Sequence, residues 1–205
     1  MQKILISLFI LISCGFNNKN IMNENVKYEF ATLGGGCFWC LEAIYKQVDN
    51  IISVESGYAG GKTVNPSYKD VCTGLTGHAE VVQIKYNADK ISYKEILEIF
   101  FSIHDPTTLN RQGNDIGTQY RSVIFYHNDV QKKIAEDIIN KLNSEHIWTN
   151  PIVTELSPYT NFYKAEDYHQ NYYFNNSQQP YCQIVISPKV EKFKKHFKPI
   201  IKTIK

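Results

Sequence analysis

The order in which strand-like and helix-like hydrophobic patterns follow one another constrains the fold of this chain more than any other feature. In a strand pattern, apolar and polar residues alternate or apolar residues form a short continuous run. In a helix pattern, apolar residues recur every three to four positions. The first six segments of the chain read strand, helix, strand, strand, helix and strand. They cover residues 28–33, 37–48, 51–58, 78–86, 92–101 and 120–126. A doubly wound parallel sheet does not suit this order, because no helix separates the second strand from the third.

The same order is that of a split βαβ unit, so we expect an α+β fold. The pattern predicts a two-layer sandwich with a ferredoxin-like core, in which helices cover one face of a mainly antiparallel sheet. Extra C-terminal elements follow: a helix over 129–142, a strand over 152–156, a helix over 163–173 and a basic amphipathic segment over 189–198. The length of 205 residues suits one domain, which we place at residues 28–198 and follow with a basic tail at 199–205.

The N-terminus has the pattern of a secretion signal. Lys3 precedes an apolar run over residues 4–12, which is too short to span a bilayer. The run ends in Leu11-Ile12-Ser13-Cys14, which resembles the cleavage box of bacterial lipoproteins, where the cysteine is lipidated. We therefore expect a signal peptide at 1–13, lipidation at Cys14 and a polar tether at 14–27. The protein would then be an extracytoplasmic, membrane-anchored lipoprotein, in the periplasm or at the cell surface. An ordinary secretory signal or an uncleaved anchor would leave Cys14 without a role.

Composition and cysteine count exclude several classes of function. The formal net charge is +2 and no basic stripe carries interleaved aromatic residues, so we expect no nucleic acid partner. The four cysteines besides Cys14 are too few for a disulfide scaffold. Cys37-x-x-Cys40 is half of a zinc knuckle, but no second pair follows, so we expect no metal site.

Cys37 stands where a predicted strand passes into a predicted helix through Gly34-Gly35-Gly36. Glycines allow the backbone to turn tightly and let a ligand approach closely. The first amides of a helix lack partners within the helix and favour negative charge. We therefore expect the helix start to lower the pKa of the Cys37 thiol and to favour the nucleophilic thiolate. The competing interpretation is a small buried cysteine among packed aromatic side chains.

Seven short motifs, in order along the chain, resemble those of the peptide methionine sulfoxide reductase A family. The first is Gly36-Cys37-Phe38-Trp39-Cys40-Leu41-Glu42, which contains the cysteine pair described above. The others are 57–61 (GYAGG), 65–68 (NPSY), 77–80 (GHAE), 104–107 (HDPT), 114–122 (NDIGTQYRS) and 165–170 (AEDYHQ). The resemblance extends over about residues 28–186. It implies an enzyme that reduces the S epimer of methionine sulfoxide, free or in proteins, and so repairs oxidised proteins.

The resemblance also implies roles for residues within these motifs. Cys37 would attack the sulfoxide sulfur and become a sulfenic acid, while Glu80 would act as general acid toward the departing oxygen. Five residues would bind the substrate: Tyr68 and Tyr120 at its oxygen, Phe38 and Trp39 at its methyl group, and Asp115 by orienting it or a nearby water. The competing interpretation makes the aromatic residues ordinary core and Glu80 a solvent-facing strand residue.

A second thiol is expected to condense with the sulfenic acid to a disulfide. The resemblance favours Cys182 as this resolving cysteine. Cys40, one helical turn from Cys37, is the alternative, and Cys72 is expected to be structural. A thioredoxin-type dithiol would then reduce the disulfide. We expect no bound cofactor, and a monomer.

Two other functions remain open on the sequence alone. One is a thioredoxin-like disulfide oxidoreductase that uses Cys37 and Cys40 at the start of a helix. The other is a noncatalytic lipoprotein that binds peptides in a tyrosine-rich groove.

Overall fold

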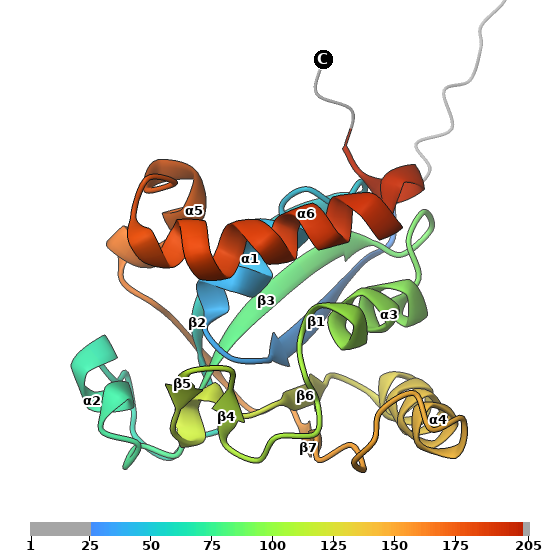
Figure 1. The fold of residues 1–205 in the computed structure, drawn as a ribbon. Coiled ribbons are helices and arrows are strands. Elements are labelled where there is room, and N and C mark those ends of the chain that lie inside the picture. The colour runs from blue at the N-terminus through green and yellow to red at the C-terminus, as the bar shows by residue number, and fades with distance from the viewer. Residues whose placement is uncertain (1–25, 203–205) are drawn as a thin grey trace, which may run out of the picture.

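The computed structural model describes residues 26–202, and a six-stranded sheet of order β7-β6-β1-β3-β2-β8 forms its centre (Figure 1). The strands of this sheet are β1 (Tyr28–Gly34), β2 (Ile51–Ala59), β3 (Ala79–Asn87), β6 (Val123–Tyr126), β7 (Glu155–Pro158) and β8 (Phe162–Lys164). Neighbouring strands run antiparallel, except that β6 and β7 are parallel. Two short strands, β4 (Arg111–Gln112) and β5 (Asp115–Ile116), pair with each other apart from this sheet.

Helices gather on one face of the sheet (Figure 1). Against that face lie α1 (Phe38–Tyr45), α3 (Tyr93–Ile103) and α4 (Asp129–Ser144), and α6 (Ser187–His196) packs over α1 and α3. The shorter helices are α2 (Tyr68–Cys72), α5 (Tyr172–Asn175), the 3₁₀ helices η1 (Thr118–Tyr120), η2 (Asp167–His169) and η4 (Lys198–Ile200), and the π-helix η3 (Cys182–Ile186). The expected α+β class is therefore confirmed.

Alternation along the strands places the core. Ala31 and Leu33 of β1 are buried toward the helices together with Val82 and Ile84 of β3. A smaller apolar cluster lies on the opposite face, where Phe125 of β6 belongs to a group packed against the partly buried Tyr159, just after β7, and Phe162, the first residue of β8. Both faces of the sheet centre are thus shielded from water.

Capping boxes start two of the helices. A capping box of Ser92 and Glu95 opens α3: the Glu95 amide donates to Ser92 Oγ at 3.2 Å, and the Ser92 amide donates to Glu95 Oε2 at 2.8 Å. Ser67 and Asp70 form a second capping box, which opens α2. The sequence analysis did not expect α2, because its five residues are too few to show a helical period.

The prediction of a helix over residues 163–173 is wrong. The segment instead contains part of β8, the η2 turn and the beginning of α5. Tyr163 lies opposite Tyr58 at the edge of β2, and Asn171 has a φ of 59°, in the left-handed region. Pairing with the sheet edge overrides the local helical pattern. The strand expected over 152–156 lies slightly later, at β7.

The fold continues beyond the residue at which we expected the domain to end. The basic segment predicted over 189–198 is α6, with Val190 and Phe193 buried, and the chain then returns toward the end of α1. Ile201 forms an isolated bridge with Val48, and the Lys202 amide donates to the Gln47 carbonyl at 2.8 Å. The described domain therefore reaches residue 202.

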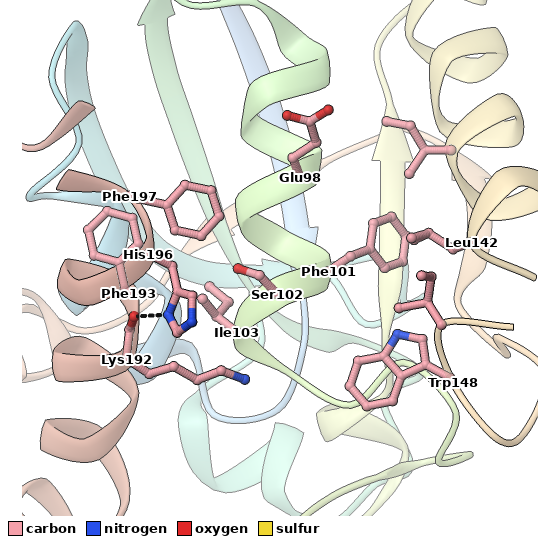
Figure 2. Close-up of a pocket in the computed structure, with 12 residues that line it drawn as sticks. Glu98, Phe101, Ser102, Ile103, Leu142, Trp148, Lys192, Phe193, His196 and Phe197 are labelled. Carbon is pink, nitrogen blue, oxygen red and sulfur yellow. Dashed lines mark hydrogen bonds between the residues drawn. The ribbon is translucent and has the colours of Figure 1, made fainter. Parts of the chain in front are cut away.

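An apolar cavity of about 380 Å³ lies between α3, α6 and the end of α4 (Figure 2). Figure 2 shows Phe193 and Phe197 of α6 on one side, Phe101 of α3 in the middle, and Leu142 and Trp148 on the other side. The residues that line it do not include any of the predicted site residues.

The predicted signal peptide and Cys14 lie outside the described residues. Within residues 26–202, no helix combines the length and the apolar character needed to cross a bilayer.

Candidate active site

Cys37 lies at the turn between β1 and α1, where the sequence predicts it. Gly36 has a φ of 89°, which L side chains rarely adopt. A Cβ at Gly34 would lie 2.9 Å from the backbone oxygen of Glu80, so only glycine allows β1 and β3 to approach this closely. Cys37 follows as the N-cap residue of α1. The glycines thus set Cys37 directly against Glu80.

The Cys37 thiol is buried, with the residue only 7% exposed. Burial raises its pKa well above the ordinary value, and the charges of Glu80 and then Cys40 raise it further. The Trp39 amide at the helix start and the Tyr181 hydroxyl lower it by smaller amounts. The prediction that this thiol has a lowered pKa is therefore wrong for the free protein, because desolvation and a neighbouring carboxylate outweigh the lowering by the helix start.

Glu80 lies on β3, next to the start of α1. Its Oε2 accepts a hydrogen bond from the Phe38 amide at 3.1 Å, and its carboxyl group lies close enough to the Cys37 thiol for each to influence the pKa of the other. Glu80 is 1% exposed, and burial raises its pKa to about 8, with a further contribution from the charge of Asp115. At neutral pH the carboxyl group is therefore mostly protonated and can donate a proton. Glu80 is not the solvent-facing residue of the competing interpretation.

Tyr68 and Tyr120 approach the same carboxyl group from two different segments. Tyr68 is the first residue of α2, and its amide donates to Glu166 Oε1 at 2.8 Å. Tyr120 ends η1. Burial raises the pKa of both hydroxyls, and the charge of Glu80 raises both further. Both hydroxyls stay protonated over the physiological range and are available as donors beside Glu80.

Phe38 and Trp39 form an aromatic wall beside Cys37. The Phe38 ring is buried, with its centroid 6.0 Å from that of Tyr58 and 5.1 Å from that of His169. Trp39 is partly exposed and stacks on Tyr172 at a centroid distance of 3.6 Å and an interplanar angle of 5°. The structure therefore brings both predicted aromatic residues to the site, together with rings from the C-terminal part of the chain.

Tyr181 is a site residue that the sequence analysis did not single out. Its hydroxyl donates to Asp115 Oδ2 at 2.8 Å, and it lies close enough to the thiols of Cys37 and Cys40 to lower the pKa of each. Asp115, on β5, lies close enough for its charge to raise the pKa values of Glu80 and Cys40. Only the fold could place the Tyr181 hydroxyl, because 66 residues separate it from Asp115.

His169 is a second residue without a predicted role, although it stands in the motif at 165–170. It is 1% exposed, and its ring lies 4.4 Å from that of Tyr68. Neither ring nitrogen has a hydrogen-bond partner within the described part of the chain. Burial lowers the pKa of His169, which favours the neutral ring. The motif was the signal that could have identified it.

The four described cysteines are free thiols in different surroundings. Cys40 is buried on α1, and Lys189 Nζ donates to its sulfur at 3.6 Å. Cys182 is also buried, on η3, and burial alone raises its pKa. Cys72, expected to be structural, is exposed at the end of α2. Cys40 is therefore the thiol whose charge acts on Cys37.

Comparisons with known proteins agree with this geometry. Residues 29–200 match the family model described as peptide methionine sulfoxide reductase. The chain is 61% identical to the peptide methionine sulfoxide reductase MsrA of Saccharolobus solfataricus, over 85% of this chain and 97% of that protein. This chain belongs to the peptide methionine sulfoxide reductase family. Family membership makes it an oxidoreductase that reduces methionine sulfoxide, as the motifs predict.

Solved structures place the family on the same fold. Reduced Mxr1 from Saccharomyces cerevisiae is 42% identical and aligns with a TM-score of 0.72 over 80% of this chain and 94% of that one. Mxr1 in complex with Trx2 is 33% identical over 73% of this chain and 88% of that one, with a TM-score of 0.52. The two other functions left open by the sequence, a disulfide oxidoreductase and a noncatalytic peptide binder, do not fit this family.

Proposed function

We propose that Cys37 attacks the sulfur of methionine S-sulfoxide while Glu80 protonates the departing oxygen. The observation that carries this assignment is the buried Glu80 carboxyl group beside Cys37, which accepts a hydrogen bond from the Phe38 amide and has a pKa of about 8. A carboxyl group must be protonated to act as an acid, and few glutamates are protonated at neutral pH. Methionine would leave, and Cys37 would become a sulfenic acid.

The proton balance of this step suits the raised pKa values of both groups. A thiol and a sulfoxide give a sulfenic acid and a thioether, without net uptake or release of protons. Glu80 gives its proton to the sulfoxide oxygen and takes up the proton that the Cys37 thiol loses. The thiol therefore need not be ionised before substrate arrives, and the pair can start from its neutral form.

Three groups of side chains support a three-point substrate site. The hydroxyls of Tyr68 and Tyr120 bind the sulfoxide oxygen beside Glu80, and Phe38 with Trp39 receives the methyl group. Asp115, held by Tyr181, orients the substrate or a water. Because sulfur, oxygen and methyl each have a fixed neighbour, the site accepts the S epimer and leaves the rest of the residue outside, free or in a protein.

A second thiol then condenses with the sulfenic acid. The motifs favour Cys182, but the proximity of Cys40 to Cys37 leads us to assign Cys40 to this role. Cys37 caps α1 and Cys40 lies in its first turn, where the Cys40 amide donates to the Cys37 carbonyl at 3.1 Å. A Cys-x-x-Cys pair at a helix start is a known disulfide-forming arrangement. A thioredoxin-type dithiol would restore the two thiols.

We also propose a cellular location and an assembly state for this chain. Residues 1–13 act as a signal peptide, Cys14 is lipidated, and residues 14–27 tether a monomeric domain to a membrane outside the cytoplasm, in the periplasm or at the cell surface. The reductant is then an extracytoplasmic thioredoxin-like protein. The order β6-β1-β3-β2, antiparallel throughout, supports assigning the core to the ferredoxin-like split βαβ arrangement.

The proposal is tested by assaying the purified chain with separated S and R epimers of methionine sulfoxide and dithiothreitol. We expect methionine from the S epimer only. Equal turnover of both epimers would contradict the three-point site.

A further inference from the structure

The only cation that contacts the thiol of Cys40 within the described residues comes from the far end of the chain. Lys189, on α6, places its Nζ 3.6 Å from Cys40 Sγ. We propose that Lys189 is a positioning residue that stabilises the thiolate form of Cys40, the form that attacks the Cys37 sulfenic acid. This inference rests on the proposed function, because it concerns the step after methionine has been released.

The surroundings of Cys40 show why such a partner is needed. The thiol is buried, and burial raises its pKa above the ordinary value. The charge of Asp115 raises it further, whereas Lys189 lowers it through its charge and its hydrogen bond. The Tyr181 hydroxyl contributes a smaller lowering. Without Lys189, every strong influence on the Cys40 thiol would favour its neutral form.

Lys189 is placed for this task by helix packing rather than by local sequence. Its helix α6 packs over α1, and 149 residues separate Lys189 from Cys40. Lys189 is partly buried, so its ammonium group is less screened by water than an exposed lysine. The other titratable group that it influences is His104, at the end of α3, whose pKa is lowered to about 4, chiefly by burial and in part by the charge of Lys189.

The step itself is balanced. The Cys40 thiolate attacks the sulfur of the Cys37 sulfenic acid, the S–O bond breaks and the S–S bond forms. The oxygen leaves as water after taking a proton from the Glu80 carboxyl group, which is protonated at neutral pH. The sulfenic sulfur is reduced and the Cys40 sulfur is oxidised to the disulfide level, so no further oxidant is needed.

The size of the effect follows from the charge. A cation within hydrogen-bond distance lowers the pKa of an acid by about 1–3 units. If loss of the Lys189 charge raises the pKa of Cys40 by about one to two units, the thiolate fraction at neutral pH falls about 10- to 100-fold. The more basic thiolate attacks about three- to tenfold faster, which offsets part of this loss. Loss of the Lys189 charge should therefore slow disulfide formation about three- to tenfold at neutral pH.

The experiment compares Lys189→Met, which keeps the stem but removes the charge, with Lys189→Arg, which keeps the charge. Each protein is mixed with one equivalent of methionine S-sulfoxide. Methionine release, disulfide formation and dimedone trapping of the sulfenic acid are then followed in time and across pH. Lys192→Met, a change at an exposed lysine on the same helix, is the matched control.

We expect Lys189→Met to release methionine at the wild-type rate but to form the disulfide about three- to tenfold more slowly, with the pH midpoint of that step raised by about one unit or more. Dimedone adducts on Cys37 should accumulate. Lys189→Arg should restore most of the rate and the pH midpoint, and Lys192→Met should behave as wild type.

The proposal is overturned if Lys189→Met forms the disulfide with an unchanged rate and pH midpoint. It is equally overturned if Lys189→Arg behaves like Lys189→Met, or if Cys40→Ser still forms a disulfide at the wild-type rate. Failure of the wild-type chain to release methionine at all would instead contradict the proposed function, so the two failures are distinguishable.

Discussion

Replacing Glu80 by Gln removes the proton that the account assigns to catalysis while preserving the shape of the site. The Gln side-chain oxygen can still accept the hydrogen bond from the Phe38 amide, which spans 3.1 Å to Oε2 in the present structure. General acids contribute about 10²- to 10⁴-fold to the reactions they assist, so the first release of methionine should slow by about that factor. Substrate binding should change little, because the oxygen keeps both tyrosine donors.

The pH dependence adds a second signature with a defined sign. Only protonated Glu80 donates, and its pKa is about 8. The wild-type rate of methionine release should therefore be constant below pH 8 and fall about tenfold for each further pH unit. In Glu80→Gln this fall should disappear. Rapid-quench measurement of the first turnover, from pH 6 to 10 in roughly one-unit steps, gives both the rate and the profile.

Cys37 supplies an internal control for the same variant. Above pH 8 the Glu80 charge raises the pKa of the Cys37 thiol, so Glu80→Gln should make this thiol more reactive toward iodoacetamide at pH 9 while making the enzyme slower. Glu55→Gln, a change on the neighbouring strand β2, should alter neither property. A Glu80→Gln enzyme whose first turnover stays within about threefold of wild type would refute the acid role.

Three further predictions follow from the same site and its surroundings. Cys37→Ala should abolish reduction of the S epimer, because no other described thiol contacts Glu80 at the turn; residual turnover in a coupled assay with dithiothreitol would contradict the assignment. Burial holds the pKa of His104 at about 4, below its ordinary 6.5, so the stability that this neutral ring confers is complete above pH 6.5 and is lost as pH falls toward 4, by about 3 kcal/mol. In His104→Gln, the free energy of unfolding measured with urea should fall less between pH 6.5 and pH 4 than in the wild type. The same dependence on pH in both proteins would show that another group causes the loss. Cys14→Ala should give an unlipidated precursor in membrane fractions by mass spectrometry, whereas normal processing would indicate an ordinary signal.

The motifs in the sequence were enough to identify Cys37 and Glu80 as a pair, because both stand in short contiguous patterns. The same reasoning misjudged the electrostatics of the pair. A helix start is visible in sequence, but the burial of the thiol and the approach of the Glu80 carboxyl group depend on how β3 packs against α1, and these raise the pKa of Cys37 instead of lowering it.

The C-terminal part of the chain was the least predictable, for a physical reason. Tyr181 and Lys189 act on thiols that lie about 140 to 150 residues earlier, through packing of η3 and α6 against α1. No local period encodes such contacts. The helix wrongly expected over residues 163–173 has the same origin, since Tyr163 pairs with the edge of β2 despite a helical pattern around it.

The central claim is that Cys37 takes oxygen from the sulfoxide as one methionine is released. It is tested most directly by mixing the Cys40→Ser, Cys182→Ser protein with one equivalent of methionine S-sulfoxide and analysing both products by mass spectrometry. The account predicts one equivalent of methionine and one added oxygen on the peptide that contains Cys37, removable by dithiothreitol and trapped by dimedone. Release of methionine with Cys37 unoxidised, or oxygen found on Cys72 instead, would contradict it.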